Sequence, residues 1–155
     1  MGGIMKKVMF SVLSLIFFVS TLAHAHCQIP CGIYDDKARL EAIKEHIDTI
    51  EKSITSIIEL SQEKDINYNQ LIRWVNNKDA HAGYIQDIVS EYFLAQRITP
   101  FGVEDAEAHM KYINELTLLH KMIIYAMKAK QTTDLSVVET MRGILKDFSL
   151  LYAGK

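Results

Sequence analysis

The sequence predicts an all-α protein, an antiparallel up-and-down four-helix bundle that follows a short cysteine-containing N-terminal segment. From Asp36 onward, apolar residues recur at intervals of three and four, which is the spacing of one helix face. Four such stretches are joined by short connections, and neither strand-like alternation nor an internal repeat interrupts them. Both cysteines precede the first stretch. The spacing and the short connections together predict the bundle over about residues 36–153.

The first two helices are predicted over about residues 36–60 and 69–97. Asp35 or Asp36 can cap the first, because a carboxylate accepts from unpaired backbone N–H groups. The polar stretch SQEKDINYN ends it, and Gly83 weakens the second helix locally. The apolar faces are Leu40, Ile43, Ile47, Ile50, Ile54 and Ile57 in the first helix and Leu71, Trp74, Val75, Ile85, Ile88, Val89 and Tyr92 in the second.

The third and fourth helices follow a breaker, ITPFG, whose Pro100 fits inside neither neighbouring helix. The third is predicted over about residues 104–130, and Thr133 or Asp134 caps the fourth. The inward residues are Met110, Ile113, Leu116, Ile123 and Met127 in the third helix and Val138, Met141, Leu145, Phe148 and Tyr152 in the fourth.

Residues 1–25 are predicted to be a secretory signal peptide that signal peptidase removes. A basic opening precedes the apolar run Val8–Ala23, and Ala23-His24-Ala25 is a small-x-small cleavage pattern. The run has 16 residues, whereas a spanning helix needs roughly 20. We therefore expect a mature chain of residues 26–155, exported to the periplasm or beyond the cell, without stable membrane association.

The mature chain is mildly acidic. Removal of Lys6 and Lys7 changes the formal charge from −2 to −4. No basic block remains, which argues against a nucleic-acid partner. A chain of this size can bury a core without covalent crosslinks, so the cysteines are available for other chemistry.

Metal sites inside the bundle are not indicated. The sequence has no Glu-x-x-His pair of the di-iron class and no C-x-x-C-H haem motif. His46, His81, His109 and His120 are scattered singly along the helices, which is typical of surface or core histidines. The methionines are interpreted as core filler.

The segment His26–Tyr34, HCQIPCGIY, offers a compact set of metal donors. Cleavage before His26 leaves an α-amine, the Cys27 amide nitrogen and the thiolates of Cys27 and Cys31. Two nitrogens and two sulfurs in fused rings favour a planar arrangement, which suits Ni(II) or Cu(II). The His26 imidazole can serve as an axial ligand. The run Pro30-Cys31-Gly32 favours a turn, which would bring the Cys31 thiolate back to the metal.

Two alternatives remain for this part of the chain. A Cys27–Cys31 disulfide is reasonable in an exported chain with an even cysteine count, although it closes only a small loop. Cleavage after Ala23 would instead expose His24-Ala25-His26, which chelates Cu(II) or Ni(II) through its amine and imidazoles.

HCQIPCGIY resembles the N-terminal hook of nickel superoxide dismutases, which has the form H-C-x-x-P-C-G-x-Y. The runs Arg39–Ala42 and Ser90–Phe93 are also similar to stretches of that family. The resemblance implies a homohexamer with one nickel ion per subunit. It implies Ni(II)/Ni(III) cycling that converts superoxide to dioxygen and hydrogen peroxide.

The same resemblance assigns roles to residues. His26, Cys27 and Cys31 would be the nickel ligands, and Pro30 would shape the hook, which covers residues 26–34. Tyr34 and Tyr92 would line the approach to nickel, and Glu41 would accept a hydrogen bond from the His26 ring. The alternative is an exported helical-bundle protein that binds copper or nickel without catalysis.

The sequence departs from the family pattern at two places. Gln28 stands where many members have an acidic residue, which should tune the charge near the hook. The position of an arginine found in some members falls on Asn77, with Lys78 beside it.

Overall fold

The structure, a computed structural model, describes residue 28 and residues 30–153. Within these residues it contains four long helices and no strand: α2 (Asp36–Ser61), α3 (Tyr68–Asp87), α4 (Ala106–Gln131) and α5 (Ser136–Ala153). A π-helix, η2 (Ile88–Arg97), follows α3 directly. Residues from Gly32 onward form one compact unit. The predicted all-helical bundle is therefore confirmed, whereas His26 and Cys27 of the predicted hook lie outside the described residues.

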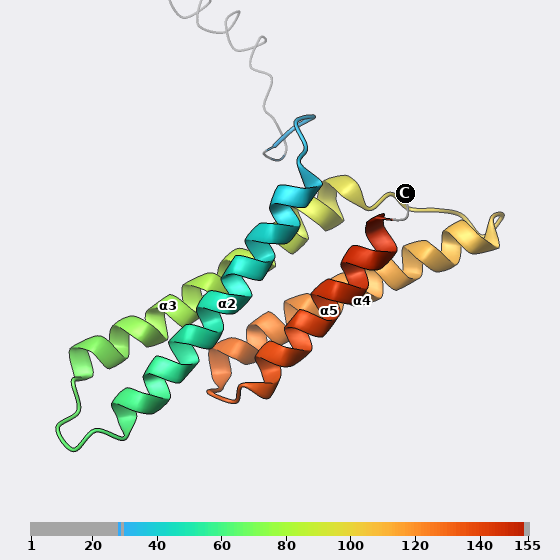
Figure 1. Ribbon diagram of the computed structural model, residues 1–155. Helices are drawn as coiled ribbons and strands as arrows, with labels where there is room; N and C mark the ends of the chain where they lie inside the picture. Colours follow the sequence, from blue (N-terminus) through green and yellow to red (C-terminus); the bar gives the residue numbers. More distant parts are fainter. Residues whose placement is uncertain (1–27, 29, 154–155) are drawn as a thin grey trace, which may run out of the picture. The chain divides into compact units, whose positions relative to one another are not determined.

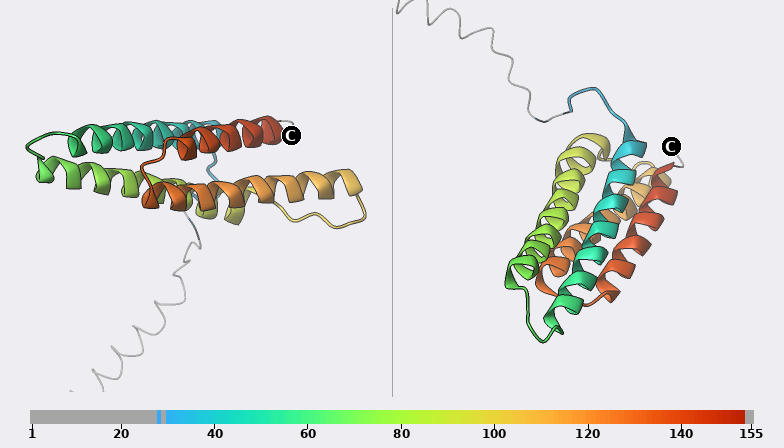
Figure 2. Two further views of the ribbon diagram at one scale, coloured as in Figure 1. Left: turned by 90° about the horizontal axis from the view of Figure 1, so that it is seen from below. Right: turned by 60° about the vertical axis from the view of Figure 1, so that its left-hand side comes forward.

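The helices form two layers. Figure 2 shows α2 and α5 side by side in one layer and α3 and α4 in the other, and helices joined by a loop run in opposite directions (Figure 1). Short connections between successive helices favour this antiparallel arrangement. The start of α2 consequently lies at the same end of the bundle as η2 and the end of α5 (Figure 1).

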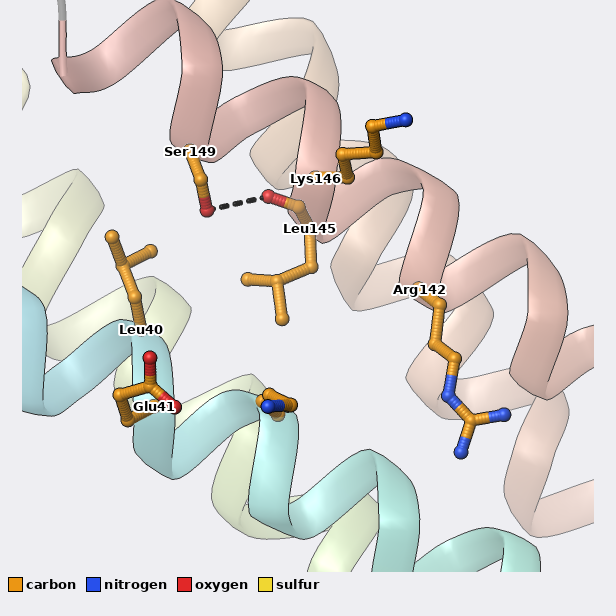
Figure 3. Close-up of a pocket in the computed structure, with 7 residues that line it drawn as sticks. Leu40, Glu41, Arg142, Leu145, Lys146 and Ser149 are labelled. Atoms are coloured by element: carbon orange, nitrogen blue, oxygen red, sulfur yellow. Dashed lines mark hydrogen bonds between the residues drawn. The ribbon is translucent and has the colours of Figure 1, made fainter.

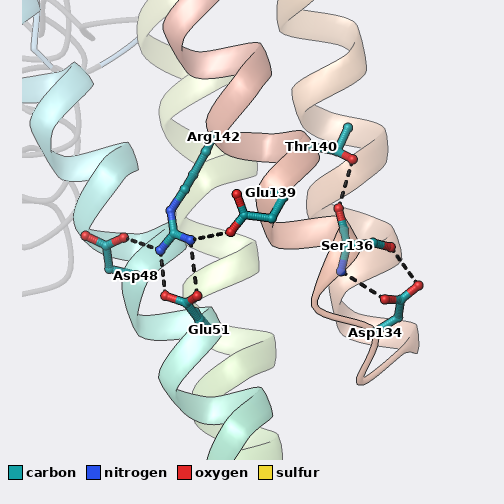
Figure 4. A network of polar contacts seen from close by, with 7 residues as sticks. All are labelled: Asp48, Glu51, Asp134, Ser136, Glu139, Thr140 and Arg142. Atoms are coloured by element: carbon teal, nitrogen blue, oxygen red, sulfur yellow. Dashed lines mark hydrogen bonds and ion pairs between the residues drawn. The ribbon is translucent and has the colours of Figure 1, made fainter.

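The helix starts are fixed by side-chain caps. Asp35 accepts from the backbone N–H of Ala38 at 2.9 Å, which confirms a predicted cap. Before α5, Asp134 accepts from both the backbone N–H and the hydroxyl of Ser136, at 2.9 and 2.7 Å (Figure 4). Each carboxylate satisfies a backbone N–H group that the helix start leaves unpaired.

The predicted apolar faces of α2 and α5 form much of the core. The buried residues of α2 include Ile43, Ile47, Ile50, Ile54 and Ile57, and those of α5 include Val138, Met141, Leu145, Phe148 and Tyr152. Leu40 is only partly buried and packs against the core. At the end of the bundle near the start of α2, Phe93 lies edge-on against Phe148 and Tyr152, with ring centroids 5.1 and 5.6 Å away.

The predicted inward face of α4 was wrong for three of its five residues, whereas Leu116 and Ile123 pack against the core. Met110, Ile113 and Met127 are 58%, 41% and 40% exposed. The buried residues of α4 are Glu115, Leu119, Met122, Ala126 and Ala129. The reason is that α4 carries apolar residues on more than one face, so that periodicity alone does not identify the face that packs. Val75 in α3, also predicted to point inward, is 36% exposed.

A charged cluster joins α2 to α5 on the surface. Arg142 of α5 lies 2.7 Å from Asp48, 2.6 Å from Glu51 and 2.8 Å from Glu139 (Figure 4). The four side chains are 33–69% exposed, so each pair contributes at most about 1 kcal/mol. Among the described residues, no helix combines the length and the hydropathy needed to cross a membrane.

Candidate metal centre and its surroundings

The predicted nickel ligands are described only in part. His26 and Cys27 lie outside the described residues. Cys31 has a free, exposed thiol, which can bind a metal once it loses its proton. Within the described residues, no group of three or more His, Cys, Asp or Glu side chains could hold a metal ion. The ligand set therefore stays a prediction.

Gly32, the residue after Cys31, has a left-handed backbone conformation with φ of 77°. A Cβ atom at this position would have nothing within 4 Å, so the need for glycine comes from the backbone and not from crowding. The glycine of the hook pattern thus permits a sharp change of chain direction between the second cysteine and Tyr34.

Tyr34 and Tyr92, 58 residues apart in sequence, lie together. Their ring centroids are 5.8 Å apart in an edge-to-face arrangement. The guanidinium of Arg97 lies 4.5 Å from the Tyr34 ring centroid, and that of Arg39 lies 5.2 Å from the Tyr92 ring centroid. The Tyr34 hydroxyl donates to Gln96 at 3.3 Å. The two predicted tyrosines thus form one group flanked by two cations.

Asp36 anchors this group to three parts of the chain. Its carboxylate accepts from the Tyr92 hydroxyl at 2.6 Å and the Tyr152 hydroxyl at 2.9 Å. Arg97 donates to it through Nε at 2.8 Å and Nη2 at 2.6 Å. We call Asp36, Tyr92, Arg97 and Tyr152 the Asp36 cluster. It connects the first residue of α2 to η2 and to the end of α5.

The π-helix explains why two residues of η2 reach one carboxylate. Hydrogen bonds in a π-helix join residues five apart; the N–H of Ile98, for example, donates to the carbonyl of Phe93. Tyr92 and Arg97 are also five apart, and both contact Asp36. Sequence reasoning missed this network, since helical spacing predicted an ordinary α-helix through these positions and Asp36 was considered only as a cap.

Protonation states in the Asp36 cluster follow from its contacts. The hydrogen bonds from Arg97 lower the pKa of Asp36 to about 2. Burial, followed by the hydrogen bond to Asp36, raises the pKa of Tyr152 to about 12. The same two causes raise the pKa of Tyr92 above its ordinary range. Both phenols are therefore neutral donors at neutral pH, and the carboxylate is charged.

The lowered pKa of Asp36 predicts acid sensitivity. In the unfolded chain the pKa of this carboxyl has its ordinary value of 3.8. The contribution of Asp36 to the unfolding free energy is therefore fully present above about pH 5. As the pH falls toward 2 this contribution is lost, which lowers the unfolding free energy by up to about 2 kcal/mol. Urea unfolding between pH 6 and pH 2.5 measures it. In Asp36→Asn we expect a smaller decline over this range, and an unchanged decline would contradict the assignment.

Glu41 lines a groove between α2 and α5. The groove has a volume of about 320 Å³ and is lined by Leu40, Glu41, Lys44, Arg142, Leu145, Lys146 and Ser149 (Figure 3). Glu41 is exposed, and within residues 30–153 its carboxylate has no hydrogen-bond or ion-pair partner. Its predicted bond to His26 remains a prediction.

Asn77 and Lys78 have other partners in the middle of the bundle. Asn77 donates to the hydroxyl of Ser53 at 3.0 Å. Lys78 is 3% exposed, and its amine donates to the carbonyls of Ala129 and Lys130 at the end of α4, at 2.6 and 2.7 Å. Asn77 precedes η2 by 11 residues, which is about 16 Å along an α-helix. Neither side chain belongs to the group around Tyr34.

The helical bundle and the donor-rich N-terminal segment are features of a small metalloenzyme. A family model described as nickel-containing superoxide dismutase matches residues 21–155, and the chain belongs to that family. No curated protein and no solved structure matches the chain. The protein is thus an oxidoreductase with a nickel cofactor and superoxide as its substrate, and a chelator without catalysis is not favoured.

Proposed function

We propose that the nickel ion of this superoxide dismutase is held at the N-terminus of the mature chain. The donors would be the α-amine of His26, the amide nitrogen and thiolate of Cys27 and the thiolate of Cys31, with the His26 imidazole as axial ligand. The observation that carries the proposal is the pattern H-C-x-x-P-C-G-x-Y inside the stretch that matches the family. The free Cys31 thiol and the left-handed Gly32 are compatible with it.

The donor set fits the chemistry. Nickel bound to thiolate and amide donors would supply reversible one-electron transfer at a reduction potential suited to both the oxidation and the reduction of superoxide. Over one cycle, one superoxide is oxidised to dioxygen, and a second takes up one electron and two protons to give hydrogen peroxide. The chain must bring superoxide close, exclude larger molecules and keep the ligands in place.

Tyr34 and Tyr92 are proposed to restrict the approach to the metal. Tyr34 follows Cys31 by three residues, so a metal held by Cys31 lies near it along the chain. Tyr34 is 40% exposed, whereas Tyr92 is buried beneath it and anchored by Asp36. A rigid aromatic pair admits a diatomic anion more readily than a bulky solute.

Arg39 and Arg97 are proposed to attract the anionic substrate. Each guanidinium lies against one ring of the tyrosine pair. The mature chain is acidic overall, so a local positive field at this end is needed to steer superoxide. Lys78 is buried against the end of α4 and does not contribute to this field.

Glu41 is proposed to orient His26. A carboxylate without a partner in residues 30–153 can accept from the free N–H of an imidazole whose other nitrogen faces a metal. Such a bond would fix the ring and its tautomer.

We further propose export to the periplasm or beyond the cell, cleavage by signal peptidase after Ala25, and assembly of the mature chain into a homohexamer. Cleavage itself creates the amine ligand.

His26→Ala tests the axial assignment. The amine, amide and both thiolates remain, so we expect one nickel per chain to be retained while turnover falls. Metal analysis and pulse-radiolysis kinetics on the mature protein measure the two quantities.

His24→Ala is the matched control, because it leaves a small-x-small cleavage pattern and is removed with the signal peptide. Its nickel content and turnover should equal those of the parent. Unchanged turnover in His26→Ala would refute the axial role, and lost nickel would show that the imidazole is needed for binding.

A further inference from the structure

Two histidines that are 35 residues apart in the sequence meet between α2 and α3. His46 Nδ1 and His81 Nδ1 are 3.0 Å apart, and the ring centroids are 4.9 Å apart. Both side chains are partly buried. The sequence had indicated isolated histidines, since their spacing along the chain gives no sign that the two helices bring them together.

The separation of the two nitrogens is that of neighbouring ligands on one metal ion. With metal–nitrogen bonds of 2.0–2.1 Å, two ligands lie between about 2.8 Å apart in square geometry and about 3.4 Å in tetrahedral geometry. The observed 3.0 Å falls within this range. Two imidazoles on facing helices are therefore spaced as two ligands of one ion, and binding would turn both ring lone pairs toward it.

The surroundings favour a neutral imidazole at His46. Burial, followed by the proximity of His81, lowers the pKa of His46 below its ordinary value. A neutral ring keeps the lone pair that a metal needs. The half-exposed ring of Tyr84 lies 5.4 Å from the His46 ring and 5.5 Å from the His81 ring, measured between centroids.

We propose that His46 and His81 form a second metal site, which binds one late first-row divalent ion such as Zn²⁺, Ni²⁺ or Cu²⁺. Imidazole nitrogen suits these ions. Among the described residues no third side chain of a ligand type joins the pair, so water completes the coordination. The ion links α2 to α3, and His46 lies ten residues after Asp36, about 15 Å along α2.

Zn²⁺ titration tests the site. The full chain carrying Cys27→Ser and Cys31→Ser keeps the N-terminal thiolates out of the measurement. Calorimetry should detect a Zn²⁺ equivalent that is lost in both His46→Gln and His81→Gln and retained in His120→Gln, whose histidine is exposed on α4. Nuclear magnetic resonance of the parent should show Zn²⁺ shifting the ring signals of His46 and His81 but not of His120.

The measurements also define failure. Equal Zn²⁺ binding in all three glutamine variants would place the metal elsewhere and overturn the proposal. If saturating Zn²⁺ leaves the ring signals of His46 and His81 unchanged, the pair shares only a proton, and the proposal is overturned. This measurement does not require any glutamine variant to fold. Because the thiolates are absent from these chains, either result leaves the nickel proposal unaffected.

Discussion

Cys31→Ser should abolish nickel retention and superoxide dismutation together while leaving the helical bundle folded. A serine hydroxyl is not deprotonated at neutral pH and is a poor ligand for a soft N/S site. The loss of one anionic sulfur also removes a donor that favours the oxidised metal. The Cys31 side chain is exposed, so its replacement costs the core nothing. Nickel analysis, a dismutase assay and circular dichroism on one preparation measure the three properties.

Gln28→Ala is the matched control for this prediction. Gln28 lies three residues before Cys31 and contributes no donor to the proposed set. Its replacement should leave nickel content and the helical spectrum unchanged and alter the rate only slightly. A Cys31→Ser protein that keeps a full complement of nickel and full activity would contradict the proposed hook. A Gln28→Ala protein without nickel would show that the ligand set is wrong.

Asp36→Ala should strongly destabilise the bundle end near Tyr34. It removes the acceptor of four hydrogen bonds, including one from Tyr92, whose side chain is 3% exposed. The buried hydroxyls of Tyr92 and Tyr152 and the partly buried guanidinium of Arg97 then lose this acceptor, for which we expect a loss of about 3 kcal/mol in unfolding free energy. Urea denaturation at pH 7 measures the loss.

Asp48→Ala provides a control of the same chemical type. Asp48 also pairs with an arginine, but it is 51% exposed, and Arg142 keeps Glu51 and Glu139 as partners. The expected loss is below about 1 kcal/mol. Equal losses in the two variants would contradict the central role assigned to Asp36.

The helices could largely be predicted from the sequence because their apolar spacing is regular. In α2 one isoleucine face dominates, so the predicted face is the buried one. In α4 several faces are apolar, and the choice depends on which neighbours pack against it; Met110 was therefore assigned to the core although it is exposed. The buried face of a helix can be predicted from the sequence when only one of its faces is apolar.

The surroundings of the candidate site could not be predicted from the sequence, because they depend on tertiary structure. Tyr34 and Tyr92 were selected from the family pattern, and the bundle places them in contact. The contributions of Asp36 and Arg97 arise from the π-helix, whose five-residue spacing has no clear signal in the sequence. The meeting of His46 and His81 requires the register between α2 and α3, which sequence spacing within each helix does not contain.

A native mass spectrum of the exported protein tests the central claim most directly, because it reports the first residue, the bound metal and the number of subunits together. We predict a chain that begins at His26, carries one nickel ion and assembles into a homohexamer. A chain that begins elsewhere, or one that lacks metal and is lighter by two hydrogens, would contradict the proposed N-terminal nickel site.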